Sequence, residues 1–245
     1  MKAALMFSFV IPCFNEQANI EQTIGEIDAA MADAGIRSYD VVVVDDCSAD
    51  QTRDVVRALC AKRSDVTLVC NPVNLGFGGA YKAGIEQAAG AFVMMIPGDN
   101  SYPREGITRI VSCAGEADII IPYAVNPEAR NVSRIALSRS FTWLVNSLFG
   151  LNVPYYNGTV LHKTELLRSI TIKTNSFAYQ AEALVKLIRA GASFKSVPVM
   201  IVERTVGRSS ALRLKNVVQV GQCLSQLLVD VYLRRPSVSP KNQSV

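Results

Sequence analysis

The chain has 245 residues, of which 49% are hydrophobic and 19% charged, so it is long enough to bury the core of one large domain. A formal net charge of +4 is too mild to indicate a nucleic-acid partner. Six cysteines without a C-x-x-C pair, together with a single histidine, exclude a recognisable zinc ligand set and are typical of reduced thiols in a cytoplasmic protein. The apolar start of the chain lacks the small-residue cleavage site of a signal peptide, which also favours the cytoplasm.

The first hundred residues alternate short apolar runs with amphipathic segments. Apolar runs bounded by polar residues predict strands, and apolar positions three or four apart predict helices. The strands are expected at about 7–12, 40–44, 66–70 and 91–96. The helices are expected at about 18–34, after residue 50, and from the glycines at 76–79 to about 89. This alternation predicts an α/β fold with a doubly wound, mostly parallel sheet and right-handed crossovers.

Two of these strands run directly into acidic residues. They are VVVVDDCSAD at 41–50 and FVMMIPGDNSYP at 92–103. The carboxyl ends of parallel strands meet at the edge where open α/β sheets bind ligands, so both sets of carboxylates are expected there. A third strand, which continues into CFNE at 13–16, ends at the same edge. The pattern predicts a nucleotide-activated substrate held against a divalent cation, and glycosyl transfer as the reaction.

The second half predicts further elements of the same domain. Helices are expected at about 104–114, 132–149 and 177–190, with strands at 118–122 and 194–202. We expect this half to build the acceptor side. The expected organisation is a catalytic domain at 1–210, an amphipathic helix at 211–235 and a disordered polar tail at 236–245.

Three motifs, in their order and spacing, resemble a known family. They are VIPCFNE at 10–16, VVDDCSADQT at 43–52 and NLGFGGAYKAGI at 74–85. They resemble the inverting glycosyltransferases of family 2, which have the GT-A fold, and within that family the polyprenyl-phosphate sugar synthases. The resemblance implies inverting transfer of a sugar from a UDP- or GDP-sugar donor to a polyprenyl phosphate or another membrane lipid, in cell-envelope glycan biosynthesis.

Alternatives to this activity stay open. One is transfer to a saccharide hydroxyl in polysaccharide or glycolipid synthesis, and another is a non-catalytic module that binds nucleotide sugars. A sugar nucleotidyltransferase would carry a basic, glycine-rich loop after the first strand, where this chain has CFNEQAN at 13–19.

The resemblance assigns the donor site to the ends of the first two strands. It implies that Pro12, Phe14 and Glu16 surround the base and ribose, and that Asp46, less surely Asp45, accepts a hydrogen bond from the base. The alternatives are that Asn15 caps the first helix and that the two aspartates form a turn or cap. Gly78 and Gly79, at a helix start, are candidates for presenting N–H groups to an anion, although glycine-rich segments are often simple turns.

The metal site departs from the family pattern. Many members end the fourth strand in D-x-D, whereas this chain has Pro97-Gly98-Asp99. Asp99 occupies the metal-ligand position, and Mg²⁺ or Mn²⁺ bound by one carboxylate, diphosphate oxygens and water is chemically ordinary. Asn100 and Ser101 are the further candidate ligands.

Catalytic groups are expected in two later segments. Arg204 lies in an R-x-x-G-x-S motif that resembles the family loop at the donor diphosphate, and Arg208 is an additional cation there. Gln180 and Glu182 resemble positions near the reacting centre, where the family often has an acid in place of Gln180. A hydroxyl acceptor needs an acidic base and a phosphate needs none, so Gln180 favours a phosphate, with Glu182 or Asp99 as the alternative base.

Acceptor binding is expected on the helix at 132–149. Arg134 and Arg139 are the candidates for the acceptor phosphate. They lie five residues apart, about 140° around a helix, so at most one faces the site. The segment Tyr155-Tyr156-Asn157-Gly158-Thr159 departs from the polyprenyl-phosphate pattern and leaves the acceptor open.

The helix at 211–235 carries an apolar stripe with basic residues at its ends. Asn216, Gln219 and Asp230 are among the polar residues that interrupt it, so it is too polar to span a bilayer. We expect it to lie in the membrane interface, which would place the protein peripherally on the inner face of the membrane. The alternatives are packing on the domain and a seam between subunits of a homo-oligomer.

Overall fold

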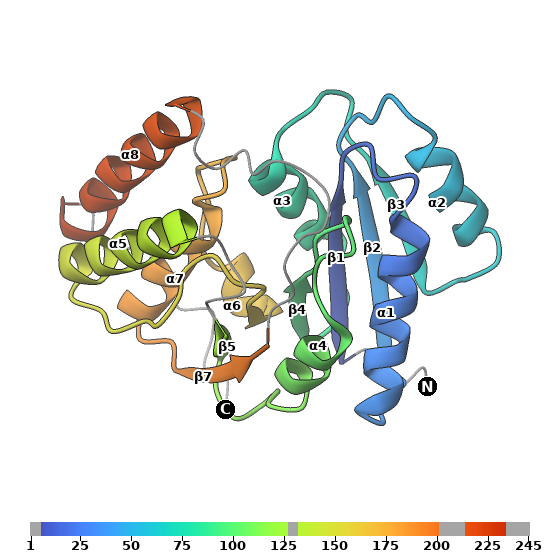
Figure 1. The fold of residues 1–245 in the computed structure, drawn as a ribbon, viewed down its shortest axis with the longest axis horizontal. Helices are drawn as coiled ribbons and strands as arrows, with labels where there is room; N and C mark the ends of the chain where they lie inside the picture. The colour runs from blue at the N-terminus through green and yellow to red at the C-terminus, as the bar shows by residue number, and fades with distance from the viewer. Residues whose placement is uncertain (1–5, 127–131, 201–213, 234–245) are drawn as a thin grey trace, which may run out of the picture.

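The computed structural model describes residues 6–126, 132–200 and 214–233, and in them one seven-stranded sheet lies among helices (Figure 1). The strand order across the sheet is β3-β2-β1-β4-β6-β5-β7. The strands are β1 (Phe7–Cys13), β2 (Tyr39–Asp45), β3 (Val66–Cys70), β4 (Phe92–Met95), β5 (Ile119–Ala124), β6 (Leu161–Lys163) and β7 (Phe194–Val199). The helices are α1 (Ile20–Asp33), α2 (Thr52–Cys60), α3 (Phe77–Gln87), α4 (Arg104–Val111), α5 (Val132–Phe149), α6 (Thr164–Arg168), α7 (Tyr179–Arg189), α8 (Leu214–Leu228) and the π-helical turn η2 (Val229–Leu233).

Strand direction confirms the mostly parallel sheet that the sequence predicts. β1 pairs in parallel with β2 and β4, and β5 pairs in parallel with β7. β6 is antiparallel to both β4 and β5, so β4 and β5 run in the same direction. The carboxyl ends of β1, β2, β4 and β5 therefore share one edge of the sheet, which we call the ligand edge. The sequence analysis missed β6 and α6, because three and five residues are too few to show a period.

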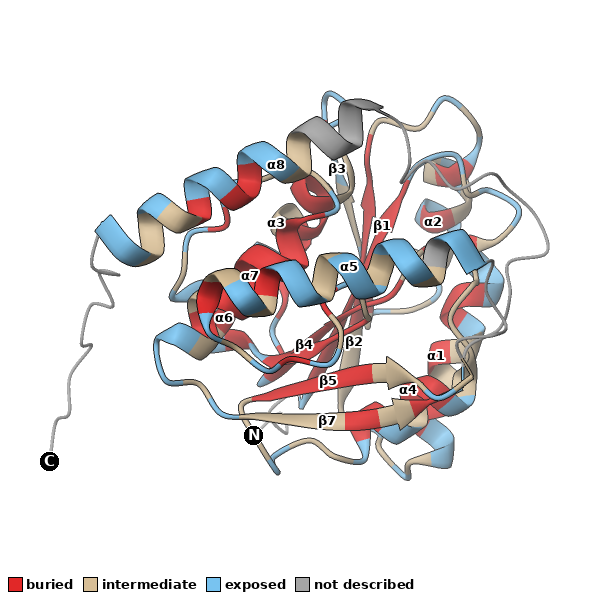
Figure 2. Ribbon diagram, turned by 60° about the vertical axis from the view of Figure 1, so that its left-hand side comes forward, coloured by how far each residue is buried: buried red, intermediate tan, exposed pale blue. Residues whose placement is uncertain are grey.

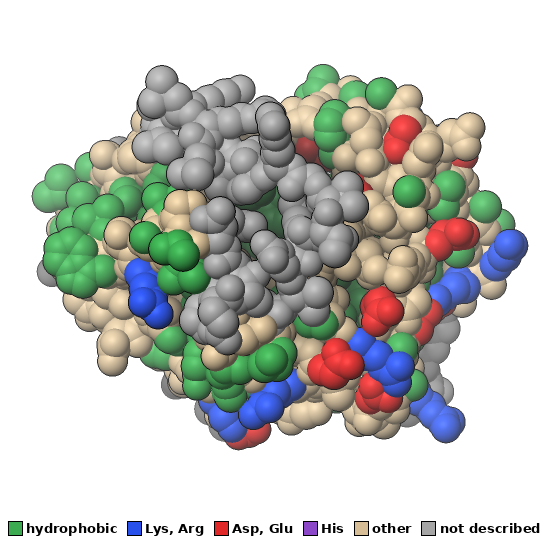
Figure 3. All heavy atoms as spheres, viewed as in Figure 1, with side chains coloured by type: hydrophobic (Ala, Val, Ile, Leu, Met, Phe, Trp, Pro, Cys, Tyr) green, Lys and Arg blue, Asp and Glu red, His purple; other side chains and the backbone are tan. Residues whose placement is uncertain are grey.

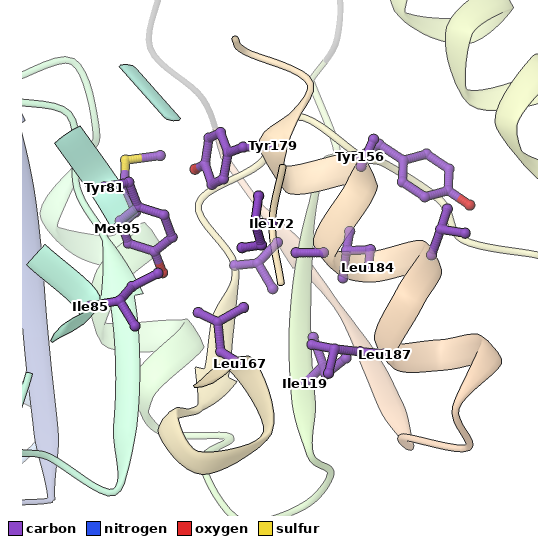
Figure 4. Packing of buried hydrophobic residues seen from close by; sticks show 14 of the residues in the cluster. Tyr81, Ile85, Met95, Ile119, Tyr156, Leu167, Ile172, Tyr179, Leu184 and Leu187 are labelled. Atoms are coloured by element: carbon purple, nitrogen blue, oxygen red, sulfur yellow. The ribbon is translucent and has the colours of Figure 1, made fainter. Parts of the chain in front are cut away.

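The apolar runs are continuous because helices cover both faces of the sheet. Val10, Val42 and Val44 belong to one buried cluster, and the alternate residues Val41 and Val43 belong to a second cluster on the other face. Figure 2 shows β1 and β5 buried along most of their length, whereas β7 is largely of intermediate burial. The first cluster continues into the second half of the chain, where Figure 4 shows Tyr81, Ile119, Leu184 and their neighbours packed together.

Helix α3 lies unusually close to the sheet at Gly84. A Cβ added there would lie 2.2 Å from Val10 Cγ1 and 3.0 Å from Val44 Cγ2. Only glycine allows this approach, so the residue sets how near the N-terminal end of α3 comes to the ligand edge.

The C-terminal helix packs on the domain, which differs from the expected membrane interface. Leu224 and Leu227 are buried in the same cluster as the sheet, and Val220, Leu228 and Val231 pack against it. The neighbours of α8 are α5 and α7, and the Tyr232 hydroxyl of η2 donates to Leu148 O at 2.8 Å. The described part of the apolar stripe, from Val220 to Val231, thus faces protein, because α5 and α7 offer it an apolar surface. Among the described residues, no helix has the length and apolarity needed to cross a bilayer. The predicted tail at 236–245 lies outside the described residues.

Candidate active site

The loops after β1 and β2 form the frame of the ligand edge. Five hydrogen bonds join them, and each uses a backbone N–H of one loop and a side-chain oxygen of the other. The pairs are Asn15 N with Ser48 Oγ, Glu16 N with Thr52 Oγ1, Gln17 N with Asp50 Oδ2, Ala49 N with Asn15 Oδ1, and Gln51 N with Gln17 Oε1, at 2.8–3.2 Å. The two motifs thus form one rigid unit. Asn15 does not cap α1, whose first flanking residue is Asn19.

The side chains predicted to surround a nucleoside lie on this frame. The Phe14 ring is 50% exposed, which leaves an aromatic face free for stacking. Glu16 is half-buried, and its carboxylate accepts from Asn19 Nδ2 at 2.8 Å. Pro12 is buried in β1 and pairs with Val44 of β2. The donor-binding roles of these three residues stay predictions.

Asp45 is fully buried and held by an arginine. Arg53 Nη2 and Nε donate to Asp45 Oδ2 at 2.8 and 3.0 Å, and the N–H of Ser48 donates to Oδ1 at 3.2 Å. These hydrogen bonds, with the charge of Asp45, raise the pKa of Arg53. The sequence analysis did not identify Arg53, although its position near the start of α2, eight residues after Asp45, was a usable signal. Asp45 therefore braces the loop from inside, and its predicted contact with the base stays a prediction.

Asp46 anchors the segment that leads into α3. Its carboxylate is buried and accepts from Asn71 Nδ2 at 2.7 Å and from the N–H groups of Leu75 and Gly76 at 2.9 Å each. A carboxylate held by three donors inside the protein fixes the position of residues 71–76. Its predicted hydrogen bond to a nucleobase stays a prediction.

Gly78 does not present its N–H as predicted, whereas the predicted role of the Gly79 N–H stays a prediction. The N–H of Gly78 donates to Asn175 O at 3.0 Å, so it is not available to an anion. A Cβ on Gly78 would lie 2.8 Å from Ser176 O, and one on Gly79 would lie 2.6 Å from Leu75 Cβ. The glycines therefore let the start of α3 contact residues 175–176.

Glu182 and Gln180 are both engaged inside the protein. The Glu182 carboxylate is buried and accepts from the N–H groups of Lys173 and Thr174 at 2.9 Å each, and from Lys186 Nζ at 2.5 Å. It thereby holds residues 173–174, which lie next to the segment that contacts Gly78. These donors engage both oxygens of Glu182, which disfavours its alternative role as a general base, and its predicted place near the reacting centre stays a prediction.

Gln180 contacts the only histidine of the chain. Its Nε2 lies 2.9 Å from Nε2 of His162, and both side chains are buried. Burial lowers the pKa of His162 to about 3, so the imidazole is neutral near pH 7. Gln180 therefore supports the core between β6 and α7, and the sequence analysis missed this pairing because the two residues lie on different elements.

Asp99 follows β4 at the ligand edge. The preceding Gly98 packs against the end of β1, where a Cβ would lie 2.6 Å from Cys13 Sγ, and its carbonyl accepts from Thr23 Oγ1 at 3.1 Å. Asp99 is half-buried as a residue. Its Oδ1 accepts from the N–H of Ser101 at 3.1 Å, and its Oδ2 is buried. Asn100 adopts a left-handed conformation with φ of 53°. The turn that carries Asp99 is therefore fixed on both sides.

The donor set near Asp99 fits a hard cation with few protein ligands. In the described part of the chain, no three acidic, histidine or cysteine side chains gather as a metal site. Carboxylate and amide oxygens suit Mg²⁺ or Mn²⁺, and Mg²⁺ is often bound by one carboxylate together with substrate phosphates. Burial, and then the charges of Glu16, Asp45 and Asp50, raise the pKa of the neighbouring Cys13 thiol. The same negative field favours a cation.

The predicted arginines lie partly outside the described structure. Arg204 and Arg208 are outside the described residues, and so is the side chain of Arg134. Arg139 is exposed on α5 and lines a cavity next to the carboxyl end of β5. Of the four, only Arg139 can be placed, and its role at an acceptor phosphate stays a prediction.

Comparison with known proteins gives a family match over most of the chain. The sequence model of glycosyl transferase family 2 matches residues 8–172. An undecaprenyl-phosphate mannosyltransferase of Micrococcus luteus is 28% identical over 82% of this chain and 85% of its own length. An undecaprenyl-phosphate 4-deoxy-4-formamido-L-arabinose transferase of Klebsiella pneumoniae is 28% identical over 85% of this chain, which spans 64% of that relative.

Solved structures resemble this fold at low sequence identity. Glucosyl-3-phosphoglycerate synthase from Mycobacterium tuberculosis, in complex with UDP, has a TM-score of 0.71 and 20% identity over 93% of this chain and 81% of that one. The same enzyme in complex with Mn²⁺, UDP-glucose and phosphoglyceric acid also has a TM-score of 0.71 and 20% identity, with the same coverage. TarS from S. aureus, in complex with UDP, has a TM-score of 0.61 and 19% identity over 92% of this chain and 66% of that one.

Proposed function

Because the chain belongs to glycosyl transferase family 2 and has the GT-A fold of its structural neighbours, we propose that this glycosyltransferase moves a sugar from a nucleoside-diphosphate donor to a polyprenyl phosphate. The family membership confirms the resemblance carried by the three sequence motifs. Relatives whose names give undecaprenyl phosphate as the acceptor support the lipid, and neighbours that bind UDP or UDP-glucose support the donor.

The observation that carries the choice of acceptor is the state of Glu182 and Gln180. A sugar hydroxyl must lose its proton as it attacks, which requires a general base. Glu182 has its oxygens filled by three donors, and Gln180 contacts His162. A phosphate oxygen is already anionic near pH 7 and needs no base. Gln180 carries an amide, which cannot act as a general base, Glu182 is engaged by its three donors, and Asp99 is assigned to the cation. This arrangement supports a phosphate acceptor.

Each residue at the ligand edge has its own proposed role in binding the donor. Phe14 stacks on the base, Glu16 accepts hydrogen bonds from the ribose, and the loop fixed by Asp46 borders the nucleoside. Asp99, with Asn100 and Ser101 as further ligands, holds Mg²⁺ or Mn²⁺, which neutralises diphosphate charge when bound.

On the acceptor side, Arg139 attracts the phosphate, while Arg204 and Arg208 stabilise the departing diphosphate. The acceptor oxygen bonds to the anomeric carbon as the bond to the diphosphate breaks, so the configuration inverts.

The acceptor also sets where the protein works. A polyprenyl phosphate stays in the bilayer, so the enzyme must act at a membrane surface, on the face that carries the nucleotide-sugar pool. We propose a peripheral association on the cytoplasmic face. Homo-oligomer formation stays a prediction.

The test is a transfer assay with labelled donors. The enzyme is incubated with UDP- or GDP-sugars, Mg²⁺ or Mn²⁺, and either undecaprenyl phosphate in detergent or a saccharide acceptor. We expect label in the lipid phosphate only, and at least about a hundredfold loss of transfer in Asp99→Asn. Asp54→Asn is the matched control, because Asp54 is exposed on α2 and pairs only with Arg57 among the described ion pairs. Transfer to saccharides alone would assign the chain to polysaccharide synthesis, and binding of donor without transfer would make it a binding module.

A further inference from the structure

A cavity of about 460 Å³ lies on the acceptor half of the molecule, between α5, the end of β5 and the segment after α5. Its size is within the range of about 300–1,000 Å³ that is typical of small-molecule sites. Residues on one face of α5, among them Ile135, Arg139 and Trp143, form one wall, and Tyr123 and Tyr155 face them from the other elements. The cavity is therefore built from α5, from the segment that follows it at 152–155 and from the end of β5.

The wall opposite α5 is held in place by Asn146. Its Nδ2 donates to Val153 O at 2.9 Å, and its Oδ1 accepts from Val153 N at 3.1 Å and from the Tyr156 hydroxyl at 2.8 Å. Val153 and Tyr156 are buried. Gly158 lets this segment lie against the end of β5, because a Cβ there would lie 3.1 Å from Pro122 Cγ and 3.2 Å from Tyr155 Cδ1. The cavity is thus formed before any ligand binds.

The cavity opens at the ligand edge. Tyr123 lies near the carboxyl end of β5, which runs in the same direction as β4, and Asp99 follows β4. An acceptor whose reactive end lies at this edge can therefore extend its remaining part toward α5. Figure 1 shows α5 alongside the half of the sheet that contains β5 and β7.

The lining has the chemistry of an amphiphile site. Three aromatic rings and Ile135 supply apolar surface, and among the described lining residues Arg139 is the only charged one and none is an acid. The Trp143 side chain is 70% exposed, so the apolar surface continues from the cavity to the outside. Figure 3 shows apolar side chains gathered in the part of the view where Figure 1 draws α5. A ligand with an anionic head and a branched hydrocarbon chain matches this arrangement.

We propose that this cavity binds the isoprenoid units next to the phosphate of the acceptor, with Arg139 at the phosphate end, an inference that rests on the proposed function. The rings of Tyr123, Trp143 and Tyr155 cover the branched chain, and Asn146 keeps the cavity open. The site thereby selects the chain of the acceptor, in addition to its phosphate.

The chain supplies its own reporter, because Trp143 is its only tryptophan. Monomeric farnesyl phosphate is titrated into the full-length enzyme while the tryptophan emission is recorded. We expect a saturable blue shift, because the ligand removes the exposed ring from water. Farnesol, which lacks the charge that pairs with Arg139, should bind about tenfold more weakly, and inorganic phosphate should produce no shift. An equal response to farnesol, or no response to farnesyl phosphate, would overturn the proposal.

Two variants test the walls separately. Tyr155→Ala removes an aromatic contact and Asn146→Ala releases the opposite wall, and each should weaken farnesyl phosphate binding about tenfold. Leu137→Ala is the matched control, because Leu137 is exposed on α5 and does not line the cavity. Circular dichroism checks that each variant is folded. If Asn146→Ala does not fold, Tyr155→Ala alone still tests the proposal.

Transfer to undecaprenyl phosphate, measured with the same proteins, separates the two proposals. If the wild type transfers sugar and Tyr155→Ala binds and transfers equally well, the cavity inference is wrong while the proposed function stands. If farnesyl phosphate binds as expected but no donor yields a labelled lipid phosphate, the proposed function is wrong while the cavity is a prenyl phosphate site.

Discussion

Asp46→Asn separates two roles of one buried carboxylate. In the structure Asp46 holds residues 71–76 through Asn71, Leu75 and Gly76, whereas the sequence resemblance has it accept a hydrogen bond from the base. Asparagine has nearly the same volume but only one acceptor oxygen. Its amide group would face donors that the second carboxylate oxygen now satisfies.

The magnitude follows from these contacts. A hydrogen bond to a charged group contributes about 1.5–3 kcal/mol, and a buried donor left unpaired costs about 1–3 kcal/mol. Asp46→Asn loses at least one such bond, whereas Gly76 N keeps a second acceptor, Asn74 Oδ1 at 3.2 Å, so we expect the free energy of unfolding to fall by about 1.5–3 kcal/mol. Urea denaturation measures this change. Hydrogen exchange should report faster exchange of the amides of Leu75 and Gly76, whose acceptor is weakened.

Urea denaturation and hydrogen exchange also provide the control for Asp46→Asn and the result that would refute the reasoning. Asp54→Asn, on the exposed surface of α2, should change the free energy of unfolding by less than about 0.5 kcal/mol. If Asp46→Asn weakens donor binding while unfolding and amide exchange stay as in the wild type, Asp46 acts on the base directly and the anchoring argument is refuted. Loss of both stability and donor affinity is the outcome that the structure predicts.

Two further predictions concern the core that supports the site. Gly84→Ala should lower the free energy of unfolding by about 1–3 kcal/mol, because its Cβ would overlap Val10. Gly25→Ala in α1 is the control and should not destabilise the protein, because no atom lies within 4 Å of the added Cβ. Equal urea midpoints for the two variants would contradict the close approach of α3 to the sheet. The buried His162 has its pKa lowered to about 3, so the unfolded chain binds a proton below about pH 6.5 that the folded chain does not, and stability falls as the pH falls through this window. Between pH 7 and pH 5 the wild type should lose about 2 kcal/mol more than His162→Asn in urea titrations, and parallel losses would show that the ring is protonated in the folded protein.

Much of the architecture could be predicted from local patterns. The runs at 41–44 and 92–96 have no polar residue, which predicted strands covered on both faces, and they are β2 and β4 of the parallel sheet. Because parallel strands present their carboxyl ends at one edge, the residues that follow them were expected together, and the paired loops after β1 and β2 lie there. The short β6 was missed, because three residues carry no period.

The state of each site side chain could not be predicted in this way. Asp45, Asp46 and Glu182 look alike in the sequence as acids near a ligand edge, yet each is buried and held by donors from other segments. Arg53 is eight residues from Asp45, and Gly76 is 30 residues from Asp46. Of the two acids predicted at the reacting centre or metal, Glu182 is buried, whereas Asp99 is half-buried as a residue.

The sequence by itself determined the class of the fold, the family and the edge proposed to bind the donor, because these depend on the order of apolar runs and on motifs that are local in the chain. The tertiary structure decided which carboxylates remain available, that the stripe of α8 packs on α5 and α7, and that α5 and β5 enclose a cavity. The physical reason is that burial and hydrogen bonding of a side chain depend on the segments packed against it. An apolar stripe on a helix gains a similar free energy of burial against a protein surface or in a membrane. The periodicity of the sequence alone therefore does not predict which of the two it contacts.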